Sequence, residues 1–175
     1  VMPIIHFGTE YREMPDSYQE MCVDMLFDAG ADVIIGGHPH VVEPMEIREI
    51  TNPDGTTRTG YVIYSMGNFI SSQRYENGVM KDIGLILDME FEKSGSETRL
   101  TAWNFAPTYV YWTDDVIGVV PVLEAYENRD QYAFLSEKDW GRIEDSYNKT
   151  IKTLTAVTDC PYEIKDYRYV FQIAQ

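Results

Sequence analysis

An alternation of strand, helix and strand within the first forty residues constrains the fold of this chain most strongly. Residues 1–7 (VMPIIHF) form an apolar run that predicts a buried strand, and residues 32–37 (DVIIGG) form a second run of the same kind. Between them, residues 17–29 carry apolar side chains at a period close to 3.6, which predicts a helix. Strands joined by such a crossover are parallel and the connection is right-handed, so we expect one βαβ unit.

The predicted helix has start and stop signals. Ser17, followed three residues later by Glu20, fits a capping box, and Gly30 is a typical residue just past a helix end. We expect the apolar stripe to pack on the sheet. Its members are Tyr18, Met21, Cys22, Met25, Leu26 and Ala29.

All three histidines of the chain fall in this unit. His6 lies at the end of the first predicted strand, while His38 and His40 follow the second. The carboxyl ends of parallel strands meet at one edge of a sheet, where open α/β sheets bind ligands. Pro39 favours extended backbone at His38, and residues two apart in an extended segment point the same way. We therefore predict that His6, His38 and His40 form a divalent-metal edge, at which His38 and His40 are spaced so that each could reach one member of a metal pair.

Two further side chains are candidates for contacts around these histidines or with a substrate. Glu10 lies in the loop after His6, where a carboxylate could orient an imidazole or bind metal. Asn68 follows a predicted strand and could present its amide to the same site. Ordinary roles stay open for all five residues: hydrogen-bonded structural histidines, a solvated loop carboxylate and a simple turn.

The rest of the chain predicts mostly antiparallel sheet and then helix. Residues 42–50 and 60–65 flank the turn sequence NPDG and predict a β-hairpin. Further strands are predicted at residues 82–93, 99–112 and 117–122, with an edge strand at 167–173. Ser136 with Asp139 resembles a helix cap, and apolar positions continue at helical spacing to Leu154.

We therefore predict a mixed α/β (α+β) fold: one βαβ unit, a mostly antiparallel sheet and a C-terminal helix. Residues 1–122 are the expected main unit, and residues 123–175 are a helical C-terminal extension packing on the same domain. The chain begins directly with a predicted strand and has no initiator methionine, so we expect a fragment or a processed chain. No run approaches the roughly 18 apolar residues that cross a bilayer, so no membrane anchor is expected within it.

Charge argues against nucleic acid as a partner. The 14 Lys and Arg stand against 29 Asp and Glu, a formal net charge of −15. Affinity for nucleic acid depends on cationic side chains that displace counterions, so an acidic surface opposes it. The same field opposes the approach of any other polyanion unless a bound cation neutralises it locally.

Three motifs in this order resemble the CapA family of bacterial capsule and poly-γ-glutamate synthesis proteins. They are HFGTEY at 6–11, AGADVIIGGHPH at 29–40 and YSMGNF at 64–69, and the resemblance extends over residues 1–122. That family is similar to the calcineurin-like metallophosphoesterases, whose αββα sandwich carries a two-metal site. The resemblance implies the carboxy-terminal half of such a sandwich. It matches His6 to a lone histidine ligand, and His38 and His40 to a Gly-His-x-His motif.

The superfamily pattern is incomplete here. The Asp-x-His and Gly-Asp motifs, which supply the carboxylate that bridges the metals, are not in this chain. Gly67-Asn68-Phe69 also lacks the histidine of the superfamily's Gly-Asn-His motif, so Asn68 is not equated with its ligand. The resemblance thus implies two divalent ions (Mn, Zn or Fe) only in a complete protein that adds the upstream half.

The function implied by the resemblance is metal-dependent hydrolytic or transfer chemistry at a phosphate or amide centre, with His38 and His40 as the catalytic residues. It would serve the synthesis or export of an anionic cell-surface polymer, with poly-γ-glutamate or a phosphoester as substrate and other capsule-synthesis subunits as partners. The implied location is the bacterial cell surface, associated with the membrane. Two alternatives stay open: a non-catalytic polymer-binding or scaffold subunit with a degenerate site, and purely structural histidines.

Overall fold

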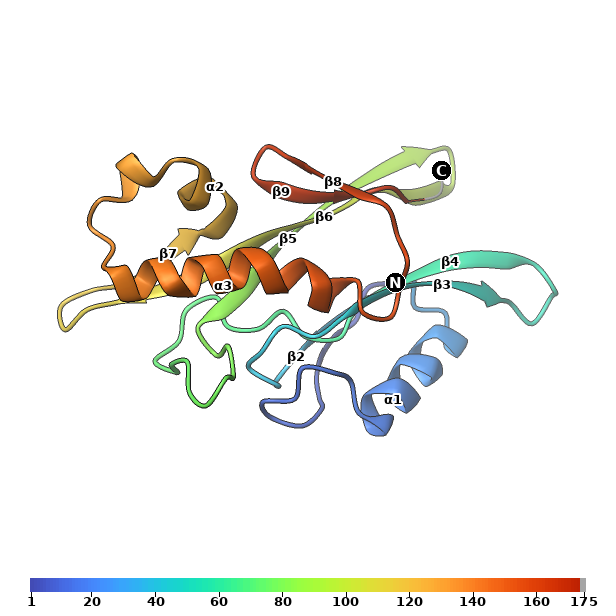
Figure 1. Cartoon of the computed structure of the whole chain (residues 1–175). Helices are drawn as coiled ribbons and strands as arrows, with labels where there is room; N and C mark the ends of the chain where they lie inside the picture. Colours follow the sequence, from blue (N-terminus) through green and yellow to red (C-terminus); the bar gives the residue numbers. More distant parts are fainter. Residues whose placement is uncertain (174–175) are drawn as a thin grey trace.

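A parallel strand pair joined by a helix begins the chain (Figure 1). In the computed structural model, which describes residues 1–173, β1 (Ile4–His6) and β2 (Val33–Gly37) are parallel neighbours connected through α1 (Ser17–Asp28). β3 (Met45–Thr51) and β4 (Thr57–Ile63) form an antiparallel hairpin, and β4 pairs in parallel with β2. The first sheet therefore has the order β1-β2-β4-β3. The predicted βαβ unit and hairpin are both confirmed.

A second, antiparallel sheet follows, as predicted for the middle of the chain. Its strands are β5 (Ile83–Ser94), β6 (Glu97–Trp112), β7 (Ile117–Pro121), β8 (Tyr162–Lys165) and β9 (Arg168–Phe171). The strand order is β5-β6-β9-β8, with β7 also paired to β6. The edge strand predicted at 167–173 was wrong in its position, because β9 lies between β6 and β8, and β8 forms the edge.

The β5–β6 ribbon is longer than the rest of its sheet. A register shift, or β-bulge, falls between Glu90 and Phe91, and residues 90–99 beyond it are exposed. The inner part of the ribbon is buried, with Trp103 and Phe105 inaccessible to solvent. The bulge thus separates a core portion of the ribbon from a projecting tip.

Helices occupy the segment between β7 and β8. They are α2 (Val122–Glu127), the 3₁₀ helix η1 (Arg129–Tyr132) and α3 (Glu137–Leu154), which lies along the β5–β6 ribbon in Figure 1. The capping box of α3 is formed by Ser136 and Asp139, as the sequence predicts. Ile143 and Leu154 of α3 are fully buried in the core that the two sheets share.

The first sheet is covered on both faces. Val33, Met45 and Tyr61 point toward the second sheet, where the Trp103 indole N–H contacts Met45 Sδ at 3.1 Å. The opposite face belongs to a second core cluster. That cluster contains Phe7, Val23, Phe27, Ala31, Ile34, Ile50, Val62 and Tyr64, so α1 covers this face.

The buried face of α1 differs from the predicted stripe. Its buried residues are Gln19, Val23 and Phe27, whereas Tyr18 and Met25 are 57% and 63% exposed. The cap was also assigned one residue too late: Asp16 accepts the Gln19 backbone N–H, and the Gln19 side chain accepts the Asp16 N–H. The helix extent itself agrees with the prediction to within one residue.

The first strand is not buried as predicted. β1 pairs only with β2 and so forms an edge of its sheet, and Ile4 is 78% exposed. Within residues 1–173, no helix combines the length and the apolar character that crossing a membrane requires.

Candidate metal centre

The histidines lie at one edge of the first sheet, as the βαβ unit predicts. His6 is the last residue of β1, and His38 follows the last residue of β2. The two strands remain joined just beyond their ends, where the Phe7 N–H donates to the Gly37 carbonyl oxygen at 2.9 Å.

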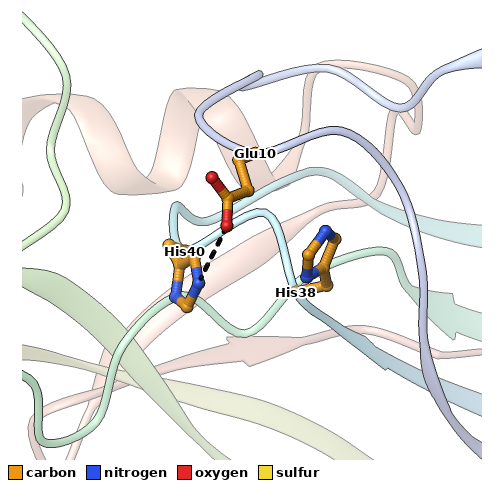
Figure 2. A group of neighbouring side chains, drawn as sticks. All are labelled: Glu10, His38 and His40. Atoms are coloured by element: carbon orange, nitrogen blue, oxygen red, sulfur yellow. Dashed lines mark ion pairs between the residues drawn. The ribbon is translucent and has the colours of Figure 1, made fainter.

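Three side chains gather at this edge (Figure 2). Glu10, His38 and His40 each offer one ligand atom, and these atoms all lie within 4.8 Å of one another. Glu10 Oε1 is 3.7 Å from His40 Nε2. Both histidines are half-buried and Glu10 is exposed, so the group is open to solvent on the Glu10 side.

Asn68 fixes the orientation of one imidazole. Its amide nitrogen donates to the Lys81 carbonyl oxygen at 2.8 Å and to the His40 carbonyl oxygen at 3.2 Å. Its oxygen therefore faces His40 Nδ1, at 3.0 Å, and accepts the proton of that nitrogen. In a neutral imidazole this contact places the lone pair on Nε2, the nitrogen on the Glu10 side, which is the arrangement in which histidine binds metal.

The backbone of the His-Pro-His segment is not extended, contrary to the prediction. His38 has φ 113° and His40 has φ 61°, both in the region that favours glycine. The segment is held by hydrogen bonds from distant residues: Tyr11 N–H donates to the Pro39 oxygen, and Met66 N–H donates to the Gly36 oxygen. Such conformations cost on the order of 1–3 kcal/mol each and concentrate at functional sites.

His6 lies beside the cluster rather than in it. Its ring centroid is 4.5 Å from that of His38, with the planes tilted by 55°. Its ring nitrogens are not among the ligand atoms that group together in the described chain. Its role as a metal ligand stays a prediction.

The donor set fits a first-row divalent ion. Two imidazole nitrogens and a carboxylate oxygen suit Zn²⁺, Mn²⁺ or Fe²⁺. Bonds of about 2.0–2.2 Å to one ion separate its ligand atoms by at most about 4.4 Å, so the spacing of the three atoms is close to what one ion requires.

Two residues near this site were missed from the sequence. Gln19 and Glu43 are both fully buried, and Gln19 Nε2 donates to Glu43 Oε2 at 2.6 Å. Burial raises the pKa of Glu43 to about 7, against a smaller lowering by the Gln19 hydrogen bond. The available signal was a single carboxylate inside the apolar run VVEPM.

Positively charged side chains lie on the loops around the candidate centre. The Lys81 ammonium lies 4.9 Å from the centre of the Tyr11 ring, and that ring is 6.1 Å from the His40 ring. Arg12 and Arg74, on the loops after Glu10 and Asn68, have no carboxylate partner within residues 1–173, whereas every other arginine there forms an ion pair. Arg74 instead stacks on Trp112, with 3.9 Å from its guanidinium carbon to the ring centre.

Comparison with known proteins gives consistent matches. The family model described as bacterial capsule synthesis protein PGA_cap matches residues 1–73. The PGA biosynthesis protein CapA of Bacillus subtilis (strain 168) is 41% identical over 68 residues, which are 39% of this chain and 16% of that protein. The capsule biosynthesis protein CapA of Bacillus anthracis is 35% identical over 81 residues, 46% of this chain and 17% of that protein. The chain thus covers about a sixth of the length of either relative.

The matched segment contains the whole candidate centre: Glu10, His38, His40 and Asn68 all precede residue 74. Residues 1–73 of this chain are therefore similar to the bacterial capsule synthesis family PGA_cap and to the two CapA proteins.

Proposed function

We propose that this chain serves in the biosynthesis of a bacterial capsule or of poly-γ-glutamate, and that Glu10, His38 and His40 hold a divalent metal ion there. The observation that carries the proposal is the convergence of these three ligand atoms to within 4.8 Å. The names of the two relatives, one in PGA biosynthesis and one in capsule biosynthesis, support the polymer assignment. The proposed location is the bacterial cell surface, in contact with the polymer and with other capsule-synthesis subunits.

The proposed chemistry is hydrolysis or transfer at a phosphoester or at the polymer's amide bond. A divalent ion would lower the pKa of a water molecule and stabilise negative charge in the transition state. In this arrangement His38 and His40 donate nitrogens, Asn68 holds His40 with Nε2 free, and Glu10 supplies negative charge. His6, whose ring lies beside that of His38 and is tilted against it, is a candidate donor for a second ion.

The test is metal binding by the full 175-residue chain. We expect isothermal titration with Zn²⁺ or Mn²⁺ to show about one tight site, which the His38→Ala/His40→Ala variant loses while remaining folded by circular dichroism. Glu163→Gln, which removes an exposed carboxylate from β8, is the matched control for weak binding to the acidic surface. Equal binding by the double variant and the unaltered chain contradicts the proposal.

A non-catalytic polymer-binding role is the second candidate, and it is favoured by Arg12 and Arg74, which have no carboxylate partner in the part of the chain that the structure describes. Carboxylate groups of a polymer could pair with these guanidinium groups without any bond being broken. Binding of poly-γ-glutamate that survives chelation by EDTA, with no hydrolysis of the polymer or of a model phosphoester, would select this role over catalysis.

A further inference from the structure

Gln19 is a polar residue in a place where an apolar residue would be expected. It is fully buried on the face of α1 that packs against the first sheet, beside Val23 and Phe27. Its amide is held at both ends: Oε1 accepts the Asp16 N–H at 3.0 Å, and Nε2 donates to Glu43 Oε2 at 2.6 Å. These two bonds fix the orientation of the amide.

Its partner Glu43 is incompletely satisfied. The side chain is fully buried, and its second oxygen, Oε1, has no hydrogen-bond partner among the described residues. A buried carboxylate with one free oxygen is costly, and a pair of apolar side chains would fill this space more favourably. The pair therefore calls for an explanation other than stability.

The pair connects the two loops that carry the candidate ligands. Gly8, two residues before Glu10, lies directly against the Gln19 amide, where a Cβ atom on Gly8 would be 2.5 Å from Gln19 Cδ. Glu43 follows His40 by three residues, and its own N–H donates to the Ser65 oxygen at 3.1 Å. The buried hydrogen bond between Gln19 and Glu43 thus links the helix residue that contacts the Glu10 loop to the segment that follows His40.

We infer that Gln19 and Glu43 are a positioning pair, which sets the Glu10 loop at the separation from His38 and His40 that one metal ion requires. Neither side chain is a ligand. The inference rests on the proposed metal centre and adds to it the residues that hold its geometry. Residues that orient metal ligands indirectly typically change metal affinity by about 10-fold to 100-fold when they are replaced.

The test compares the Zn²⁺ and Co²⁺ affinities of full-length variants by isothermal titration, each under conditions where the variant is folded. We expect Gln19→Leu to weaken binding by at least about 10-fold and to alter the visible absorption of bound Co²⁺. Gln19→Asn, which shortens the amide by one methylene, is the second variant should the leucine not fold, with a weakening of about fivefold or more expected.

Two further variants separate positioning from stability. Gln19→Glu/Glu43→Gln exchanges the partners, so that an amide again donates to a carboxylate and the Asp16 N–H keeps an acceptor; we expect affinity to return to within about threefold of the original. Val23→Ala, a buried truncation on the same face of α1, is the matched control and should destabilise the fold with affinity unchanged.

Unchanged affinity in folded Gln19→Leu or Gln19→Asn overturns the inference and leaves the metal centre standing. An equal loss of affinity in Val23→Ala also overturns it, because the effect would then follow stability alone. Absence of metal binding in the unaltered chain would instead overturn the proposed function itself.

Discussion

His38 is the residue at which folding and the proposed metal binding make opposite demands. A backbone φ of 113° is unfavourable for any side chain with a Cβ, yet an imidazole stands there and faces Glu10 and His40. Glycine would adopt this conformation without strain. A histidine at such a position fits a ligand better than a structural residue.

We predict that His38→Gly raises the free energy of unfolding by about 1 kcal/mol and abolishes tight metal binding, since it relieves the strain and removes a donor. Urea denaturation and titration calorimetry measure the two effects. Asn77→Gly, at φ 52° in an exposed turn, is the control that should gain stability only. A less stable glycine variant with unchanged metal affinity would mean that the imidazole is structural.

Glu43 makes a separate prediction about pH. Its pKa in the folded chain is about 7 against 4.5 as the ordinary value, because burial disfavours the charged form. Well below pH 4.5 the carboxyl is neutral in both the folded and the unfolded chain. As the pH rises from about 4.5 to about 7, the free energy of unfolding falls, because the unfolded chain releases the proton more readily than the folded chain.

Glu43→Gln keeps an oxygen that accepts from Gln19 and cannot ionise. We therefore expect the stability of the variant, relative to the unaltered chain, to increase by about 3 kcal/mol between pH 4.5 and pH 8, since each pKa unit is worth 1.36 kcal/mol. Urea denaturation across this range tests it, and parallel pH profiles for the two proteins would contradict it.

At the scale of single residues, the sequence predicted which residues lie close together better than it predicted their backbone conformation. Parallel strands bring His6 and His38 to one edge through topology alone, which the apolar patterns reveal. The positive φ of His38 and His40 depends instead on bonds to Tyr11 and Met66, which are remote in sequence. The local rule for residues before proline could not anticipate them.

Among the elements, α1 shows what an amphipathic pattern can and cannot decide. The helix carries two apolar stripes, one through Met21 and Met25 and one through Val23 and Phe27. Periodicity predicted the helix and its length, but both stripes satisfy it equally. Gln19, which looks out of place on an apolar face, lies on the stripe that is buried.

The attachment of α3 depends on a buried ion pair. Arg142 binds both carboxylate oxygens of Asp82, at 2.9 and 3.0 Å, and both side chains are less than a tenth exposed. The guanidinium also lies 3.8 Å from the Tyr75 ring centre. The helix is thereby tied to the residue that precedes β5 and to the loop after Asn68.

We predict that Arg142→Leu lowers the free energy of unfolding by about 3–5 kcal/mol, because Asp82 keeps a buried charge without its partner. Arg129→Leu, on the neighbouring 3₁₀ helix, removes an ion pair with Glu144 in which both side chains are 48% exposed, and should cost less than about 1 kcal/mol. Chemical denaturation compares the two variants. Similar losses in the free energy of unfolding of both variants would show that the buried ion pair stabilises the fold no more than the exposed one.

At the scale of the whole molecule, the distribution of charge matters more for the binding of an acidic polymer than the net charge does. A net charge of −15 repels an acidic polymer, yet Arg12 and Arg74, the two arginines without a carboxylate partner among residues 1–173, both lie on loops that follow residues of the candidate centre. Composition predicted the repulsion, whereas the ion-pair pattern indicates where we propose that an anionic polymer binds. A metal ion at the centre would add to the same local field.

We predict that Arg12→Ala/Arg74→Ala weakens the binding of labelled poly-γ-glutamate by about 10-fold at low salt, measured by fluorescence anisotropy, because each lost carboxylate contact is worth about 0.5–1 kcal/mol. The difference should shrink as salt screens the charges. Arg99→Ala, whose partner is Glu92 on the ribbon tip, is the control with no expected effect. An equal loss in the control would point to a general charge effect.

The bulge in the β5–β6 ribbon also has a practical consequence for engineering. Beyond Glu90 and Phe91 the strands pair with each other, and residues 90–99 are exposed. A short epitope or a fluorophore-binding peptide inserted at residues 94–96 would therefore extend a solvent-facing turn, far along the ribbon from the buried Trp103. The tip is thus a suitable place to attach a reporter while the core, and the candidate ligands it supports, remain as they are.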